Sequence, residues 1–184
     1  GPSLFKVSSL AYDADRRLVY YTTDNNDYRD LMSVSLDGGK PKRLQKDARI
    51  GDLVFDEKNQ LLYGLRHQNG FVTLVSIKPP YDTWEQVHSW PYGEVLYDID
   101  VSPDGKLLSA SMAEVSGKQF LRVFDIEGLA EGRSDALMEF DFGFAVPEGF
   151  VFSPDGRFLY GSSYYTGISN IFRYELANGD IEAV

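Results

Sequence analysis

The sequence contains the stretch Phe152-Ser-Pro-Asp-Gly-Arg-Phe-Leu-Tyr160, and related stretches recur along the chain. A close copy is Val101-Ser-Pro-Asp-Gly-Lys-Leu-Leu-Ser109. Two weaker copies lie upstream: Tyr12-Asp-Ala-Asp-Arg-Arg-Leu-Val-Tyr20 and Phe55-Asp-Glu-Lys-Asn-Gln-Leu-Leu-Tyr63. The spacings between the corresponding residues are 43, 46 and 51 positions, counted over Asp13, Asp56, Ser102 and Ser153. Four copies at this spacing indicate a structural repeat.

Each copy predicts a β-hairpin, because an apolar run enters a four-residue turn and another apolar run leaves it. In the third copy, the Ser102 hydroxyl can bond to the following backbone, and Pro103 presets φ near −65° for the second turn position. Gly105 accepts the left-handed conformation that ends the turn. In the second copy we expect Asn59 to take that left-handed position.

Two further strand-like runs follow each hairpin. The third runs are rich in β-branched and aromatic residues, and we expect them at Leu31–Leu36, Phe71–Ile77, Gln119–Ile126 and Asn170–Leu176. The fourth runs are short, and we expect them at Lys42–Gln45, Glu85–Ser89, Ala136–Asp141 and Asp180–Val184. The unit is therefore a meander of four antiparallel strands in about 45 residues, the period of a propeller blade.

Helix signals are weak. The best candidate is Ile126–Leu137, but Gly128 and Gly132 interrupt it, so we predict a loop leading to the outer strand. The fold class expected from the pattern is all-β.

Composition excludes several classes of function. The 184 residues carry 18 Lys and Arg against 28 Asp and Glu, a formal net charge of −10, which argues against nucleic acid as a partner. There is no cysteine, which removes disulfides, thiolate catalysis and cysteine-based zinc sites. No apolar run approaches the roughly 20 residues of a transmembrane segment.

The repeat resembles that of TolB-like β-propellers and of the propellers attached to prolyl-oligopeptidase-class peptidases. The match is specific in the two Ser-Pro-Asp-Gly units, and in the first two units it depends on spacing and apolar pattern. We expect residues 1–3 to be a scar of tag cleavage and residues 4–184 to form one partial propeller domain. The expected blades span about 8–46, 50–90, 95–142 and 147–184.

The resemblance implies six or more blades, whereas four repeats are present. Either the chain is an arc cut from a larger propeller, or it closes as a small four-bladed ring; we favour the fragment. An open arc exposes apolar faces at both ends, and two copies could pair these ends as a homodimer.

The first strand of each blade lines the channel of a propeller, which places acidic residues at the predicted channel mouth. The candidates are Ser8, Ser9, Gly51, Asp52, Tyr97, Asp98, Glu148 and Gly149, with Glu94 and Asp100 close by. Tyr92, Tyr97 and Phe144 would add aromatic edges. Such a funnel would attract a cation or a basic peptide. The alternative is that these carboxylates are solvated or bond neighbouring backbone amides.

Other candidate sites are weaker. Asp24-Asn25-Asn26-Asp27 with Asp30 could hold calcium weakly, although the EF-hand spacing is absent. The two histidines, His67 and His88, are too few for an ordinary imidazole metal site, and no metal site or cofactor is predicted. The Tyr164-Tyr165-Thr166-Gly167 loop suits recognition, and we single out Tyr165 there.

Motifs for catalysis are missing. The sequence has no Gly-x-Ser-x-Gly nucleophile elbow and no phosphate-binding glycine motif. We therefore predict a non-catalytic module that binds a protein or peptide through the channel mouth and loops. The alternative is the substrate-gating propeller of a larger cell-envelope peptidase, and a metal-dependent propeller enzyme is a third possibility. The TolB-like resemblance implies the periplasm or cell envelope of a bacterium.

Overall fold

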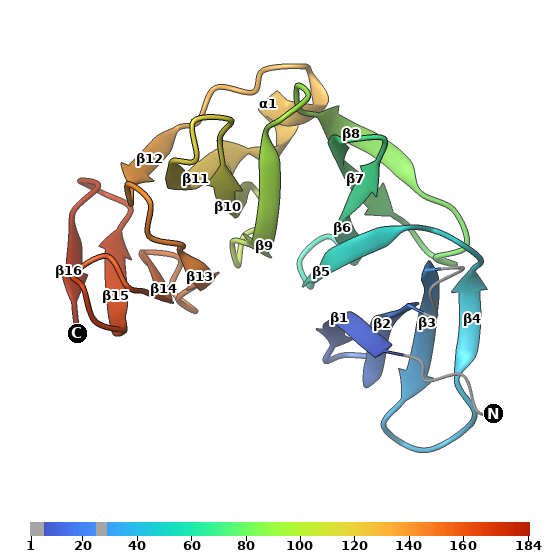
Figure 1. The fold of residues 1–184 in the computed structure, drawn as a ribbon. Helices are drawn as coiled ribbons and strands as arrows, with labels where there is room; N and C mark the ends of the chain where they lie inside the picture. The colour runs from blue at the N-terminus through green and yellow to red at the C-terminus, as the bar shows by residue number, and fades with distance from the viewer. Residues whose placement is uncertain (1–5, 25–28) are drawn as a thin grey trace. The chain divides into compact units, whose positions relative to one another are not determined.

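The structure is a computed structural model, and it describes residues 6–24 and 29–184. The chain divides into two compact units, residues 1–89 and 90–184. Each unit holds two four-stranded antiparallel sheets in which the strands follow one another in sequence order (Figure 1). The predicted all-β fold of four four-stranded meanders is confirmed, and each sheet is called a blade below.

Blades 1 and 2 make up the first unit. Blade 1 consists of β1 (Lys6–Asp13), β2 (Leu18–Asp24), β3 (Arg29–Ser35) and β4 (Lys42–Gln45). Blade 2 consists of β5 (Ile50–Asp56), β6 (Leu61–Gln68), β7 (Phe71–Ile77) and β8 (Glu85–Ser89). The inner strands β1 and β5 lie beside one another.

Blades 3 and 4 make up the second unit. Blade 3 consists of β9 (Val95–Val101), β10 (Leu107–Ala113), β11 (Gln119–Asp125) and β12 (Met138–Asp141). Blade 4 consists of β13 (Glu148–Phe152), β14 (Phe158–Ser163), β15 (Asn170–Glu175) and β16 (Ile181–Ala183). The inner strands β9 and β13 are again neighbours.

The expectation of a plain loop after β11 was wrong, because a short helix, α1 (Ile126–Ala130), begins the connection to β12. The Asp125 carboxylate caps it by accepting a hydrogen bond from the Gly128 amide at 3.0 Å. Gly132 follows the helix with φ +86°, where glycine is favoured. The two glycines that argued against a helix thus lie at its capped first turn and just beyond its end. No helix in the described part of the chain is long and apolar enough to cross a membrane.

The Ser-Pro-Asp-Gly turns have the geometry that their residues predict. The Ser102 hydroxyl donates to the Asp104 carboxylate at 2.6 Å and accepts from the Leu107 amide at 2.9 Å. Ser153 makes the equivalent bonds to Asp155 and Phe158, at 2.6 and 3.0 Å. The two glycines have φ +71° and +68°. Each serine thereby closes the hairpin from inside the turn.

The aspartate turns of blades 1 and 2 close differently. Asp13 and Asp56 accept a hydrogen bond from the amide three residues ahead, at 3.0 Å in both turns. The left-handed residue is then one position later than in the serine turns: it is Arg17 (φ +51°) and Gln60 (φ +56°). The assignment of Asn59 to the left-handed position was therefore wrong, because the aspartate side chain bonds the Asn59 amide itself.

Apolar packing between consecutive blades forms the core of each unit. In the first unit the Tyr20 ring of blade 1 stacks on the Phe55 ring of blade 2, with centroids 5.6 Å apart. In the second unit Phe142, just after β12, packs against Phe150 of β13 at 5.7 Å. Leu121 and Tyr174 extend this second core. Large aromatic residues therefore join one blade to the next, as expected for this repeat.

Candidate functional site

The six residues predicted to form the binding site lie in the second unit: Glu94, Tyr97, Asp98, Asp100, Glu148 and Tyr165. Of the other channel candidates, Gly149 lies on β13, whereas Ser8 and Ser9 on β1 and Gly51 and Asp52 on β5 lie in the first unit. Antiparallel order places the segments 90–95, 113–119, 141–148 and 163–170 at one end of blades 3 and 4, opposite the Ser-Pro-Asp-Gly turns. We call this the loop end. Glu94 and Glu148 lie there, Tyr165 lies in its β14–β15 loop, and Tyr97, Asp98 and Asp100 follow along β9.

The inner strands carry a bulge at one repeat position. The pairing of β9 with β10 shifts register between Tyr97 and Asp100, and Asp98 within this segment has φ +48°. In β13 the corresponding residue is Gly149, with φ +62°, and in β5 it is Asp52, with φ +45°. At each bulge the regular pairing of the inner strand with the second strand of its blade is interrupted.

Asp98 and Asp100 use their carboxylates to join blade 3 to blade 4. The Asp98 carboxylate accepts a hydrogen bond from the Gly149 amide at 3.0 Å, and the Asp100 carboxylate accepts from the Phe152 amide at 2.7 Å. In the first unit the Ser9 hydroxyl accepts from the Leu53 amide at 2.6 Å and so links blade 1 to blade 2. These side chains thus satisfy backbone donors that no strand pairing reaches.

Burial sets the electrostatics of Asp100 and Tyr97. Burial raises the pKa of Asp100, and the amide donors of Phe152 and Val101 oppose the rise. Burial, followed by the charges of Asp98 and Glu148, raises the pKa of Tyr97 to about 12. The Tyr97 hydroxyl donates to the Gln119 side-chain carbonyl at 2.6 Å. Tyr97 is therefore a neutral, anchored side chain in an acidic setting.

Glu94 and Glu148 remain available at the loop end. Glu148 is exposed and Glu94 is half-buried, and neither forms an ion pair with any residue that the structure describes. The nearby cations of blade 3 are already engaged: Lys118 pairs with Asp141 at 2.7 Å, and Arg122 pairs with Glu114 and Glu139. The loop end thus carries negative charge without local neutralisation.

Exposed apolar side chains lie next to these carboxylates. Tyr92, Val115 and Phe144 are 73%, 81% and 79% exposed, and we call them the apolar patch. Their loops meet: a Cβ on Gly93 would touch Val115 at 2.6 Å, and one on Gly117 would lie 3.6 Å from the Phe144 ring. Sequence reasoning named Tyr92 and Phe144 as aromatic edges but missed Val115, whose position between two paired strands could have indicated this end.

Tyr165 is half-exposed and fixed in place by other rings. It meets Phe142 edge to face with centroids 5.5 Å apart, Phe140 at 5.4 Å and Phe172 at 6.4 Å. Tyr164 beside it is more exposed. The loop predicted to suit recognition therefore presents Tyr165, which is held by other rings, and Tyr164, which is more exposed.

The remaining candidates do not gather into a site. His67 is partly buried, and burial lowers its pKa. In the predicted calcium loop, Asp24 pairs with Arg29 and Asp30 with Arg43, while Asn25, Asn26 and Asp27 lie outside the described residues, as does the predicted tag scar. Within residues 6–24 and 29–184, no three His, Asp or Glu side chains are grouped to hold a metal ion.

Solved structures share this architecture. The putative TolB of Agrobacterium tumefaciens matches all of the chain with a TM-score of 0.74 and 19% identity, over 62% of its own length. TolB of Acinetobacter baumannii also matches the whole chain, with a TM-score of 0.64, 17% identity and 42% of its length. Prolyl oligopeptidase B of Galerina marginata matches 97% of the chain with a TM-score of 0.62, 14% identity and 29% of its length.

The fold is a β-propeller. The expected resemblance to TolB and to prolyl-oligopeptidase propellers is thereby confirmed at the level of the fold. The propeller chain spans only part of each of these structures, which is consistent with the expected piece of a larger propeller. No family model and no curated protein matches the sequence.

Proposed function

We propose that this propeller chain is a non-catalytic interaction module that binds a basic, partly apolar peptide segment of a partner protein at the loop end of blades 3 and 4. The observation that carries the proposal is the pairing of unneutralised carboxylates with an exposed apolar patch: Glu94 and Glu148 beside Tyr92, Val115 and Phe144. Lysine or arginine side chains would meet the carboxylates, while apolar side chains of the same segment cover the patch.

The predicted site residues divide into two roles under this proposal. Asp98 and Asp100 hold the inner strand of blade 4, so they position the site. Glu94 and Glu148 contact the partner, and Tyr97 and Tyr165 form rigid walls because each is anchored by its neighbours. Rigid aromatic walls lose little conformational entropy on binding, which suits recognition.

A peptide selection tests the proposal. Peptides displayed at random and selected on the purified chain should be enriched in lysine or arginine next to large apolar residues. The binding of a selected peptide should weaken about fivefold when both Glu94→Gln and Glu148→Gln are introduced, as expected for two partly solvated ion pairs.

The matched control is the pair Glu57→Gln and Glu127→Gln, which changes the net charge equally at exposed positions outside the loop end. This control should bind the peptide as the unchanged protein does. Equal weakening in both double variants would show a general charge effect, and no weakening in either would remove the assignment of Glu94 and Glu148.

A second candidate is the substrate-gating propeller of a larger peptidase, favoured by the structural likeness to prolyl oligopeptidase B. A hydrolase motif in the coding sequence that flanks these residues would support this role.

We further propose a periplasmic or cell-envelope location, because the repeat resembles that of TolB-like propellers. We also propose that two copies pair the open ends of their propeller arcs as a homodimer. Sedimentation of the purified chain at several concentrations tests the dimer.

A further inference from the structure

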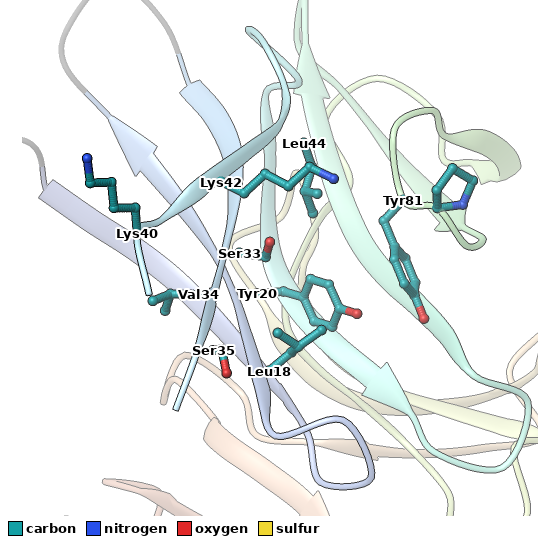
Figure 2. A pocket seen from close by; sticks show the side chains of 10 residues that line it. Leu18, Tyr20, Ser33, Val34, Ser35, Lys40, Lys42, Leu44 and Tyr81 are labelled. Carbon is teal, nitrogen blue, oxygen red and sulfur yellow. The ribbon is translucent and has the colours of Figure 1, made fainter. Parts of the chain in front are cut away.

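A cavity of about 300 Å³ lies in the first unit, away from the site described above (Figure 2). Strands β2, β3 and β4 of blade 1 form one side, and the β7–β8 loop of blade 2 supplies Pro80 and Tyr81. Leu18, Leu44 and the Tyr20 ring give it apolar walls. This volume is at the lower end of the range for small-molecule sites, so it suits a ligand of about the size of a single substituted ring.

The cavity holds a buried hydroxyl without a partner. Tyr20 is only 1% exposed, and its ring is held by Phe55 and by Tyr81, whose centroid lies 4.9 Å away. Its hydroxyl oxygen has no hydrogen-bond partner among the residues that the structure describes. Burial, followed by the neighbouring Tyr81, raises the pKa of Tyr20, so this hydroxyl keeps its proton. A buried donor of this kind is costly unless an acceptor meets it.

The cavity also carries positive charge in an acidic chain. Lys40 and Lys42 line it, no carboxylate does, and neither lysine is ion-paired within the described part of the chain. The arginines nearby are engaged, because Arg17 pairs with Asp37 and Arg43 with Asp30. Figure 2 shows the Lys42 side chain extending toward the Tyr81 side of the cavity, while that of Lys40 points away.

We infer that this cavity binds a small organic carboxylate with an apolar body. Its carboxylate would accept a hydrogen bond from the Lys42 ammonium and, once a small shift of the surrounding side chains uncovers the buried Tyr20 hydroxyl, a second one from that group. Its body would lie on Leu18, Leu44 and Tyr81. The Ser33 hydroxyl lines the same space and offers a further donor. A carboxylate is favoured over an inorganic anion because aliphatic and aromatic side chains form so much of the wall.

Benzoate is the probe for the test, with neutral benzamide as its isosteric comparison. In titrations followed by amide chemical shifts, benzoate should move the signals of Ser33, Val34 and Leu44, and benzamide should bind more weakly. Lys42→Gln should weaken benzoate binding roughly three- to tenfold, as expected for one charge-assisted hydrogen bond. Lys106→Gln, an exposed lysine in the other unit, is the charge-matched control and should leave the affinity unchanged.

The variant Tyr20→Phe tests the proposed role of the Tyr20 hydroxyl separately from that of Lys42. It keeps the ring and removes only the unpartnered hydroxyl, so stability toward urea should be unchanged or higher while benzoate affinity falls several-fold. Equal binding of benzoate and benzamide, unchanged affinity in Lys42→Gln, or shifts confined to residues outside the cavity would overturn the proposal. Because the cavity and the loop end share no residue, this test stands apart from that of the proposed function.

Discussion

At the scale of single residues, Asp100 shows how a charge is used to hold two blades together. Its carboxylate is the acceptor for the Phe152 amide, yet burial raises its pKa. A raised folded-state pKa means that the folded protein binds the proton more tightly than the unfolded chain. Its contribution to stability is therefore full below the unfolded pKa of about 3.8 and is lost as the pH rises through the folded pKa.

We expect Asp100→Asn to remove this pH dependence, because asparagine stays neutral and its side-chain carbonyl can still accept from Phe152. Urea unfolding of the two proteins should show the stability of the variant, relative to the unchanged protein, rising from pH 4 to pH 7. Asp104→Asn is the opposite control, since the Ser102 hydroxyl lowers the pKa of Asp104 and its contribution is lost as the pH falls. The same pH trend in both variants would contradict the assignment.

A second prediction for a single residue concerns the close packing of Gly161 against the Phe150 ring. A Cβ at this position would overlap the Phe150 ring, which is buried between blades 3 and 4. Gly161→Ala should therefore lower the free energy of unfolding by about 1–3 kcal/mol. Gly51→Ala is the matched control: its Cβ would meet only Arg29, at 3.8 Å, and unfolding should change by less than about 0.5 kcal/mol. Equal losses at both sites would show that packing against Phe150 is not the cause.

At the scale of elements, the serine turn is the feature that repeats. Ser102→Ala leaves the Leu107 amide without its acceptor inside the turn, and the free energy of unfolding should fall by about 1–2 kcal/mol. Ser169→Ala, at an exposed loop position, should have little effect. Urea unfolding measures both, and a tolerated Ser102→Ala would mean that Pro103 and Gly105 alone close the hairpin.

The elements also show what local sequence can and cannot predict. The third strand of blade 3 was expected at Gln119–Ile126 and is observed at Gln119–Asp125, because alternation and turn chemistry are local properties. The helix α1 was missed because its stability depends on the Asp125 cap, which compensates for Gly128. The left-handed Asp98 was also beyond reach, since its bond to the next blade joins it to Gly149, 51 positions along the chain.

At the scale of the whole molecule, repetition explains why the fold was predictable and the site was not. Four repeats of about 45 residues, each with one turn and four strand-like runs, indicate a propeller because period and strand count both match a propeller blade. The candidate residues Asp98 and Glu148 belong to one acidic group in the sequence, yet the structure gives the first a backbone partner and leaves the second exposed. The difference between the two carboxylates depends on the contact of Asp98 with Gly149, which is 51 positions away. A pattern in the local sequence does not predict such a contact.

Amide chemical shifts, followed as a selected basic peptide is added, would show whether the proposed loop end of blades 3 and 4 is the binding surface. We predict shifts at residues 93–97, 114–119 and 144–149, with little change in the segments 102–107 and 153–158 of the Ser-Pro-Asp-Gly turns. Shifts concentrated at those turns, or in the first unit, would show that the peptide binds elsewhere on the protein.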